Sequence, residues 1–543
     1  MIDPTTLLRD LRRELTKLED DLRRRTEDEE LPELRDGLRR EHEEAFRRGR
    51  TAATFTEWRD EQVTQAAVAW LLGCVFVRFC EDNRLVGPVW LAGPEDRRAE
   101  AADAHTAYFQ KHPERNDRDW LLEAFRYLEG LAATKAIFDR AHNPLWRIQP
   151  SADAAAQLVA FWRRPAADGR PAHDFAVPDL DTRFLGDLYQ DVSEAARKRY
   201  ALLQTPEFVE EFILDRTLER AISERGLEGL KLIDPACGSG HFLLGAFQRL
   251  LEHWHRAAPG MDTRERVQLA LDAIHGVDLN PFAVAIARFR LTVAALRASG
   301  LPRLEQAPAF HYHLAVGDSL LHGSEQLTIE GLDPRYHEDV ALSGFTYATE
   351  DLDILREVLH PGQYDVVVSN PPYIAVNDKA LNKAYRRRYK TCKGKYSLSV
   401  PFCERLFQIG KKGNPENGQA GWVGQITANS FMTRQFGTRL IEDFLANLQL
   451  VEVVDTSGVH LPGHGTATII LIGKPSHPAG KTIRVVQHVR DEPSKPADAS
   501  EGLVWGDIVE HIDEPDSQTP YITVVDVDST KPSPMVPSRR WRG

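Results

Sequence analysis

Two short stretches of this sequence combine residue types that could carry out a reaction together. The first, Asp234-Pro-Ala-Cys-Gly-Ser-Gly-His-Phe-Leu243, follows an apolar run and leads into a helical pattern. Its glycines, Gly238 and Gly240, let the backbone turn sharply and approach a ligand closely. The helix that follows offers free N–H groups at its N-terminus. Asp234 adds a carboxylate for a cationic group, so the stretch predicts a turn that cradles a small polar ligand.

The spacing around this turn argues against NAD as the ligand. The next glycine after Gly240 is Gly245, so the G-x-G-x-x-G pattern is broken. Asp278 ends the next apolar run and is placed to accept hydrogen bonds from ribose hydroxyls, but it lies farther from Asp234 than in dinucleotide folds. Taken alone, the turn is equally compatible with a structural glycine turn in any α/β protein.

The second stretch, Tyr364-Asp-Val-Val-Val-Ser-Asn-Pro-Pro-Tyr373, ends an apolar strand pattern with two prolines. Pro371 and Pro372 stiffen the backbone and remove two donors, which leaves the Asn370 side-chain oxygen and backbone carbonyls as acceptors. An exocyclic amino group of adenine could donate to the Asn370 oxygen and the Pro371 carbonyl, which would aim its lone pair at an electrophile. Tyr373 could stack on a base flipped out of the duplex. An incidental strand-ending turn is the alternative, and the glycine turn weakens it.

These motifs require strands to position them. From about 200 to 475, short apolar runs alternate with helical stretches, which predicts an α/β fold with a mostly parallel sheet and helices on both faces. Ligands bind such sheets at the carboxyl ends of the strands, where both motifs fall. The seven expected strands are Leu230–Ile233, Ile274–Val277, Tyr312–Val316, Tyr364–Ser369, Gly421–Thr427, Leu450–Asp455 and Thr466–Ile472.

The residues before and after this α/β region have different sequence patterns. Residues 1–195 are predicted to form an all-α N-terminal domain, since leucines recur at helical spacing from Leu8 to Leu22 and Val63–Cys80 is apolar all round. Residues 196–475 form the expected α/β domain. Residues 476–543 are rich in proline and are expected to begin a C-terminal region that the chain does not complete.

Composition excludes several classes of protein. The net charge is −13, which argues against a generally cationic nucleic-acid binder but allows a local basic groove. The five cysteines form no C-x-x-C pair, and no third ligand accompanies His311 and His313, so no metal site is expected. No Pro-Cys dipeptide supports the cysteine route to 5-methylcytosine. With neither a signal peptide nor a membrane span visible, the expectation is a cytoplasmic protein.

Together the motifs resemble the gamma-group N6-adenine DNA methyltransferases, which use S-adenosylmethionine and have a Rossmann-like class I methyltransferase fold with a mostly parallel seven-stranded sheet. The resemblance covers about residues 200–475. It implies that Asn370, Pro371, Pro372 and Tyr373 are catalytic. It also implies cofactor contacts from Thr205, Pro206, Asp234, Pro235, Ala236, Gly238, Gly240, Asp278, Leu279, Asp318 and Ser319.

The resemblance also assigns roles within the cofactor motifs. Thr205 would cap a helix, and Pro206 would take the first position of that helix. Asp278 would hold the ribose hydroxyls, and the Asp318 carboxylate would receive the amino group of the cofactor's adenine. Where the family often places an aromatic residue that sandwiches the target base, this chain has Val459-His460-Leu461-Pro462. His460 is therefore a candidate partner for Tyr373, although a surface-loop histidine is the plainer interpretation.

The helical N-terminus, with Val75-Phe-Val-Arg-Phe-Cys-Glu-Asp-Asn-Arg84, narrows the resemblance to the PglX methyltransferases of phage-exclusion (BREX) systems of type 2. That family implies methylation of host DNA as a self mark, together with partner proteins. Members of this family are much longer than this chain, which resembles their front portion.

A basic stretch follows the second motif. Lys379 to Lys395 carries eight basic residues and no acidic one, with Tyr385 and Tyr389 interleaved. Because it borders the expected site, it predicts contact with the phosphates of double-stranded DNA. The residues expected to bind DNA are Lys383, Arg386, Arg387, Arg388, Lys390, Lys393 and Lys395.

Two alternatives stay open at this point. The same catalytic motif serves enzymes that methylate another planar amine or amide, such as a glutamine side chain in a protein. The chain could also bind cofactor or partners in a defence complex without catalysing transfer. The basic stretch and the large helical extension favour DNA as the substrate.

Overall fold

A computed structural model describes residues 3–186, 205–323, 350–413, 420–462, 465–478 and 482–528. Nine strands of these residues form one sheet in the order β3-β2-β1-β4-β5-β7-β6-β8-β9. The first five strands in this order run parallel to one another. β7 is antiparallel to both of its neighbours, β8 is parallel to β6, and β9 is antiparallel to β8. The sheet is therefore mixed, with a parallel half and a mostly antiparallel half.

All seven expected strands are present, within one or two residues of their expected ends in most cases. They are β1 (Leu232–Asp234), β2 (Ile274–Asp278), β3 (His313–Val316), β4 (Val366–Ser369), β5 (Trp422–Ala428), β6 (Gln449–Asp455) and β7 (Thr468–Lys474).

The prediction of seven strands was wrong, because β8 (Thr482–His488) and β9 (Ile522–Asp528) extend the same sheet. These two strands mix apolar and polar residues and are only partly buried, as expected at the margin of a sheet. Prolines flank both strands, and the proline-rich composition of this region concealed them in the sequence. The division of the chain after residue 475 stays a prediction, and the boundary at 195 lies outside the described residues.

Helices cover both faces of the sheet, and successive side chains of a strand point to opposite faces. Val366 and Val368 of β4 belong to one apolar cluster, whereas Val367 belongs to the other. This is the period of two that a strand buried on both faces must show. The helices of the α/β region are α9 (Glu207–Arg225), α10 (His241–Ala257), α11 (Thr263–Ala273), α12 (Pro281–Ala298), α14 (Leu352–Val358), α15 (Lys379–Arg388), α16 (Ser399–Ile409), α17 (Ser430–Thr433) and α18 (Leu503–His511).

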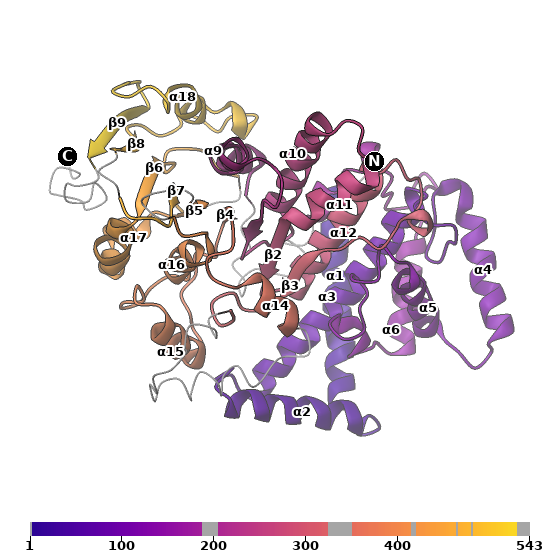
Figure 1. Ribbon diagram of the computed structural model, residues 1–543. Helices are drawn as coiled ribbons and strands as arrows, with labels where there is room; N and C mark the ends of the chain where they lie inside the picture. The colour runs from indigo at the N-terminus through magenta and orange to yellow at the C-terminus, as the bar shows by residue number, and fades with distance from the viewer. Residues whose placement is uncertain are drawn as a thin grey trace.

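The N-terminal region is helical, as predicted, and gathers on one side of the sheet, with the C-terminal strands at the opposite end (Figure 1). Its helices are α1 (Pro4–Glu27), α2 (Pro32–Arg47), α3 (Phe55–Asp82), α4 (Arg98–Lys111), α5 (Asp117–Gly130) and α6 (Ala152–Arg163). α3 starts at a capping box in which Thr54 and Glu57 satisfy each other's backbone donors. It contains the buried helix expected at Val63–Cys80.

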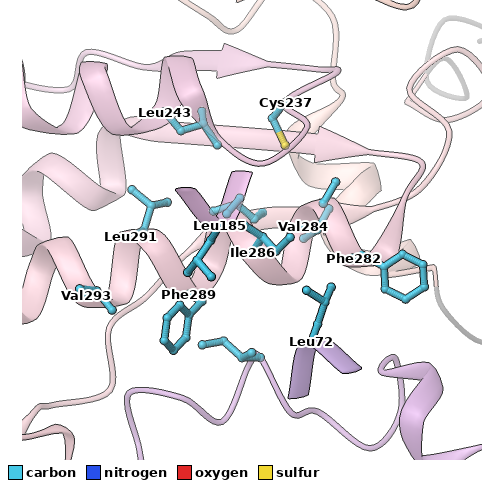
Figure 2. Close-up of a cluster of buried hydrophobic side chains, with 14 of the residues drawn as sticks. Leu72, Leu185, Cys237, Leu243, Phe282, Val284, Ile286, Phe289, Leu291 and Val293 are labelled. Atoms are coloured by element: carbon cyan, nitrogen blue, oxygen red, sulfur yellow. The ribbon is translucent and has the colours of Figure 1, made fainter. Parts of the chain in front are cut away.

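The helical region and the α/β region share one apolar core. Figure 2 shows α12 between Leu72 of α3 on one side and Cys237 of the glycine turn on the other. The Phe289 ring of α12 stacks on Phe76 of α3 with ring centroids 4.4 Å apart. Because α12 touches both parts, the N-terminal helices support the element that backs the glycine turn.

α3 is also the one helix among the described residues that is long and apolar enough to cross a membrane by length and composition. In its most apolar window 94% of the residues are buried inside the protein. The core helix of a folded domain passes the same test.

Candidate active site

The two motif loops lie side by side at one edge of the sheet. β1 pairs in parallel with β2 on one side and with β4 on the other. The Ser369 hydroxyl at the end of β4 donates a 2.8 Å hydrogen bond to Oδ1 of Asp234 at the end of β1. The glycine turn and the Asn370-Pro371-Pro372-Tyr373 loop therefore emerge next to each other, as the two motifs required.

The two glycines of the turn do different work. Both have positive φ, +52° at Gly238 and +83° at Gly240, which side chains rarely tolerate. A Cβ on Gly240 would lie 2.9 Å from Cβ of Ala287, so this glycine lets the turn pack on α12. A Cβ on Gly238 would meet nothing within 4 Å. Gly238 therefore leaves open space beside the turn.

Asp234 is a buried carboxyl held from two sides. Besides the Ser369 hydroxyl, the amide of Ala236 donates to its Oδ1 at 3.0 Å. Burial raises the pKa of Asp234 to about 7, against these hydrogen bonds that favour the charged form. A cationic group bound nearby would stabilise the ionised carboxylate and lower this pKa again.

Asp278 joins the end of β2 to the glycine turn. Its Oδ2 accepts from the Gly238 amide at 2.9 Å, and its Oδ1 accepts from the Asn280 amide at 2.8 Å. Burial raises its pKa to about 6. The neighbouring Leu279 is 45% exposed, which is unusual for a leucine in this otherwise well-packed region. The next position therefore offers apolar surface beside a carboxylate.

Asp318 follows β3, and its carboxylate is occupied by the protein itself. Its Oδ1 accepts from the Leu320 amide at 2.8 Å, and its Oδ2 accepts from the hydroxyl of Tyr385 at 2.6 Å. The next residue, Ser319, donates its hydroxyl to the Pro235 carbonyl at 2.6 Å. The loops after β1 and β3 are thus bonded to each other.

The side chains of the Asn370–Tyr373 loop form a short chain of hydrogen bonds. The Asn370 amide nitrogen donates to Oγ1 of Thr205 at 3.2 Å, and the Tyr373 hydroxyl donates to the Asn370 amide oxygen. Pro371 is buried and Pro372 half-buried. Burial raises the pKa of Tyr373 above its ordinary value, so the hydroxyl stays a donor.

The predicted cap at Thr205 was wrong. α9 begins at Glu207, and Pro206 is its N-cap residue, with ψ of 143° and no capping side chain. Because Pro206 has an extended ψ, Thr205 lies one residue too far from the helix to cap it. Its hydroxyl accepts from Asn370 instead. The segment before α9 therefore contacts the Asn370–Tyr373 loop directly.

The basic stretch forms α15 and the loop after it. Lys383, Arg387, Lys390 and Lys395 are exposed, and Lys393 is half-buried. Arg386 is exposed but contacts the protein as well, through Asn382 at 2.7 Å, the Gly394 carbonyl and the Tyr396 ring.

Three members of the stretch turn inward. Arg388 is half-buried and donates to the Leu321 carbonyl. Tyr385 and Tyr389 are buried, so the interleaved tyrosines do not lie among the exposed cations. The exposed part of the stretch borders a surface hollow of about 380 Å³, whose lining includes Lys379, Lys383 and Arg387.

Several residues that position the site were missed in the sequence. Ser369 links β4 to β1, and its place directly before Asn370 was the available signal. The guanidinium of Arg290 donates to the Ser239 carbonyl at 2.7 Å and holds the glycine turn from α12. Arg405, on α16, donates to the Ser319 carbonyl at 3.0 Å. A buried arginine in an apolar helical pattern carries no motif, so these two could not be found from spacing.

Phe431 is buried in α17, directly after β5, and β7 is buried along its whole length. His460 is half-buried in the turn after β6. Its pairing with Tyr373 across a base stays a prediction. Among the described residues, no group of three or more His, Cys, Asp or Glu side chains could hold a metal ion.

Two protein-family models match this chain. Residues 272–460 match the Eco57I restriction-modification methylase, and residues 215–320 match the DNA-methyltransferase domain of MmeI. Both matches lie in the α/β region and together span the two motif loops.

Curated relatives extend the match to nearly the whole chain. The adenine-specific methyltransferase PglX of Streptomyces coelicolor is 51% identical over 98% of this chain and 45% of its own length. The type II methyltransferase M.BstVI of Geobacillus stearothermophilus is 25% identical over 49% of this chain and 40% of its own length. The chain thus spans less than half the length of these relatives.

Solved structures agree on the fold. The DrdV–DNA complex, determined by cryo-electron microscopy, matches 89% of this chain and 42% of that chain with a TM-score of 0.51 and 15% identity. The sequence comparisons confirm the resemblance indicated by the motifs: this chain is a relative of the PglX adenine-specific methyltransferase, and it has the α/β methyltransferase fold with a helical N-terminal region.

Proposed function

We propose that this chain transfers a methyl group from S-adenosylmethionine to N6 of an adenine flipped out of double-stranded DNA. One observation carries the proposal: the ligand-cradling turn and the acceptor loop emerge from adjacent parallel strands and are joined by the Ser369–Asp234 hydrogen bond. A donor and an acceptor of a methyl group must meet in this way for direct transfer, because positioning supplies most of the catalysis.

The residues around the glycine turn fit S-adenosylmethionine. Gly238 leaves open space where a side chain would otherwise stand. Asp234 offers a carboxylate for the cationic end of the cofactor, and Asp278 offers one for the ribose hydroxyls. Leu279 exposes apolar surface that suits a purine ring. When bound, the cofactor supplies a methyl group activated by its sulfonium. Pro235, Ala236, Gly240 and Ser319 complete the proposed cofactor contacts.

Asn370 and Pro371 would orient the target amine. An amide oxygen has two lone pairs, so Asn370 can keep its contact with Tyr373 and accept a further hydrogen bond from an adenine amino group. Hydrogen bonds to two acceptors draw the nitrogen lone pair out of the ring and toward the methyl donor. No proton has to leave before attack. Pro372 stiffens the loop, and Tyr373 would stack on the base.

The exposed cations of α15 and its loop would hold the DNA backbone. The chain is acidic overall, so a cluster with no acidic member next to the acceptor loop gives a local phosphate-binding surface. We include Lys383, Arg386, Arg387, Lys390, Lys393 and Lys395 in this surface. The structure gives Arg388 a contact inside the protein, so its share in DNA binding is the smallest of the set.

The broader setting rests on the family resemblance. We propose a cytoplasmic enzyme of a type 2 phage-exclusion system that marks host DNA together with partner proteins. We also keep the division into a helical domain (1–195), a methyltransferase domain (196–475) and the start of a C-terminal region (476–543). Growth of phage on cells with and without Asn370→Ala in this chain would test the setting.

Transfer of a labelled methyl group separates the proposal from its alternatives. The full chain is incubated with labelled S-adenosylmethionine and either duplex DNA or a mixture of unmodified proteins, and the product is identified by mass spectrometry. N6-methyladenine is the expected product. Label on a protein glutamine would favour the protein-modifying alternative. Cofactor binding without any labelled product would favour a non-catalytic subunit.

A further inference from the structure

Three side chains on the inner face and at the C-terminal end of α15 donate hydrogen bonds to the turn that contains Asp318. Tyr385 donates to the Asp318 carboxylate at 2.6 Å, Tyr389 donates to the Leu320 carbonyl at 2.9 Å, and Arg388 donates to the Leu321 carbonyl. We call these three contacts the clasp. Their acceptors are nearly consecutive, so α15 and the turn after β3 are held as one unit.

Tyr385 is placed to fix the plane of the Asp318 carboxylate. Its ring is 4% exposed, and burial together with the nearby carboxylate raises its pKa well above the ordinary value. The hydroxyl therefore stays a donor across the physiological range. With Leu320 bonded to one carboxylate oxygen and Tyr385 to the other, Asp318 cannot rotate freely. A carboxylate has about four acceptor positions, so it retains capacity for another donor.

The start of α15 is fixed as well. Asp378 caps the helix by accepting from the amides of Ala380 and Leu381 at 2.7 and 3.1 Å. Its other oxygen accepts from the amide of Ala52, in the helical N-terminal region, at 2.7 Å. Because both of its ends are bonded to the rest of the protein, α15 is one rigid element. DNA bound to its exposed basic face can therefore affect the hydrogen bonds of the clasp.

We propose that Tyr385 is a positioning residue that orients Asp318 toward the 6-amino group of the cofactor's adenine and makes cofactor affinity depend on DNA bound to α15. This inference rests on the proposed function. It assigns the buried tyrosine of the basic stretch to the cofactor rather than to the DNA. By linkage, bound cofactor must raise DNA affinity by the factor by which DNA raises cofactor affinity.

The test measures how well the site tells adenine from hypoxanthine. S-adenosylhomocysteine and S-inosylhomocysteine are titrated by calorimetry into the full wild-type chain, Tyr385→Phe and Tyr389→Phe. Inosine presents a carbonyl where adenine presents its amino group, so an oriented carboxylate rejects it. We expect Tyr385→Phe to reduce the ratio of the two affinities about fivefold to tenfold, the worth of one ordinary hydrogen bond.

Tyr389→Phe is the matched control, since it removes a buried hydroxyl from the C-cap residue of α15, and this hydroxyl does not bond to the carboxylate. It should lower the melting temperature by a similar amount and keep the wild-type ratio. Repeating the S-adenosylhomocysteine titration with saturating duplex DNA should show a DNA-dependent gain in wild type that shrinks toward one in Tyr385→Phe.

Two results would overturn the inference in distinguishable ways. If the wild-type chain binds S-adenosylhomocysteine and methylates DNA, but folded Tyr385→Phe keeps both the ratio and the DNA-dependent gain, the role of Tyr385 is refuted and the proposed function stands. If the wild-type chain binds neither nucleoside, the proposed function fails and this inference fails with it.

Discussion

The two halves of the candidate site are held in different ways. On the cofactor side, Asp234, Asp278 and Asp318 each accept at least one main-chain N–H from within two residues or from the glycine turn. On the target side, the side chains of Asn370 and Tyr373 bond to each other, and that of Asn370 bonds to the side chain of Thr205. Main-chain donors cannot rotate away, whereas side chains can. The cofactor half is therefore preorganised, and the target half can rearrange when a base enters.

The largest effect should come from breaking the target half. Asn370→Ala removes the acceptor that orients the amine, and we expect the methylation rate to fall about 100- to 1000-fold, as for other preorganised polar groups at a reacting centre. Cofactor affinity should change by less than about twofold, because main-chain amides hold Asp278 against the glycine turn. Rates are measured by tritium transfer to duplex DNA.

Asn447→Ala, on an exposed segment away from both loops, is the matched control and should keep the wild-type rate. A loss of cofactor affinity as large as the loss of rate in Asn370→Ala would show that the two halves are not separable.

The next largest effect should come from the cofactor half. Asp278→Asn loses the charge that accepts from ribose hydroxyls, and we expect the dissociation constant for S-adenosylmethionine to rise about tenfold to a hundredfold. The rate at saturating cofactor should fall much less. Glu265→Gln, an exposed carboxylate on α11, is the control for charge. An equal loss of cofactor affinity in the two variants would show that Asp278 has no specific role in binding the cofactor.

Cofactor affinity should also depend on pH, with a sign set by the buried carboxyls. The pKa values of Asp234 and Asp278 are raised to about 7 and about 6, and the cofactor needs both groups ionised. Binding is then strongest above pH 7 and weakens as pH falls through 7 and then through 6, by at most about tenfold per pH unit for each proton taken up. Calorimetry between pH 5 and 8 measures this. An affinity that rises on acidification would contradict the assignment.

The sequence predicted the local motifs of the site but not the contacts between distant segments. The glycine turn, Asp278 and the loop at Asn370 were found because their chemistry is local, with residue type and spacing visible in one stretch. The parallel direction of β2, β1 and β4 also followed from alternating strands and helices, but their order in the sheet did not. Contacts between distant segments could not be found this way. Tyr385 on Asp318 and Thr205 under Asn370 join residues 67 and 165 positions apart.

In the basic stretch the sequence predicted too many surface residues. All of its basic residues and tyrosines were expected on one DNA-binding surface, but Arg388, Tyr385 and Tyr389 face the protein. The helical period of α15 divides the stretch into two faces, and the sequence did not reveal which face packs inward. β8 and β9 were missed because they lie in a proline-rich region, which was interpreted as the start of a further region rather than as part of the sheet.

The smallest effect should come from the exposed face of α15. Replacing Lys383 and Arg387 by alanine should weaken DNA binding several-fold for all sequences and reduce the slope of log affinity against log salt by about two, near one for each lost phosphate contact. Filter binding at several salt concentrations measures both quantities. The control replaces Arg9 and Arg24 of α1, which are 62% and 78% exposed in their side chains.

Arg388→Ala sharpens this comparison between faces. Because Arg388 bonds to the Leu321 carbonyl, its loss should lower the melting temperature while changing the salt slope less than the double variant does. A full unit of slope lost in Arg388→Ala would place this side chain on the DNA instead.

The most direct test of the central claim is to map modified bases in DNA from a bacterial host that lacks its own adenine methyltransferases and expresses this full chain. We predict N6-methyladenine at defined sites with the wild-type chain and none with Asn370→Ala, at equal protein levels and equal cofactor affinity. Methylation that persists in Asn370→Ala, or unmodified adenine beside a wild-type chain that binds the cofactor, would contradict the account.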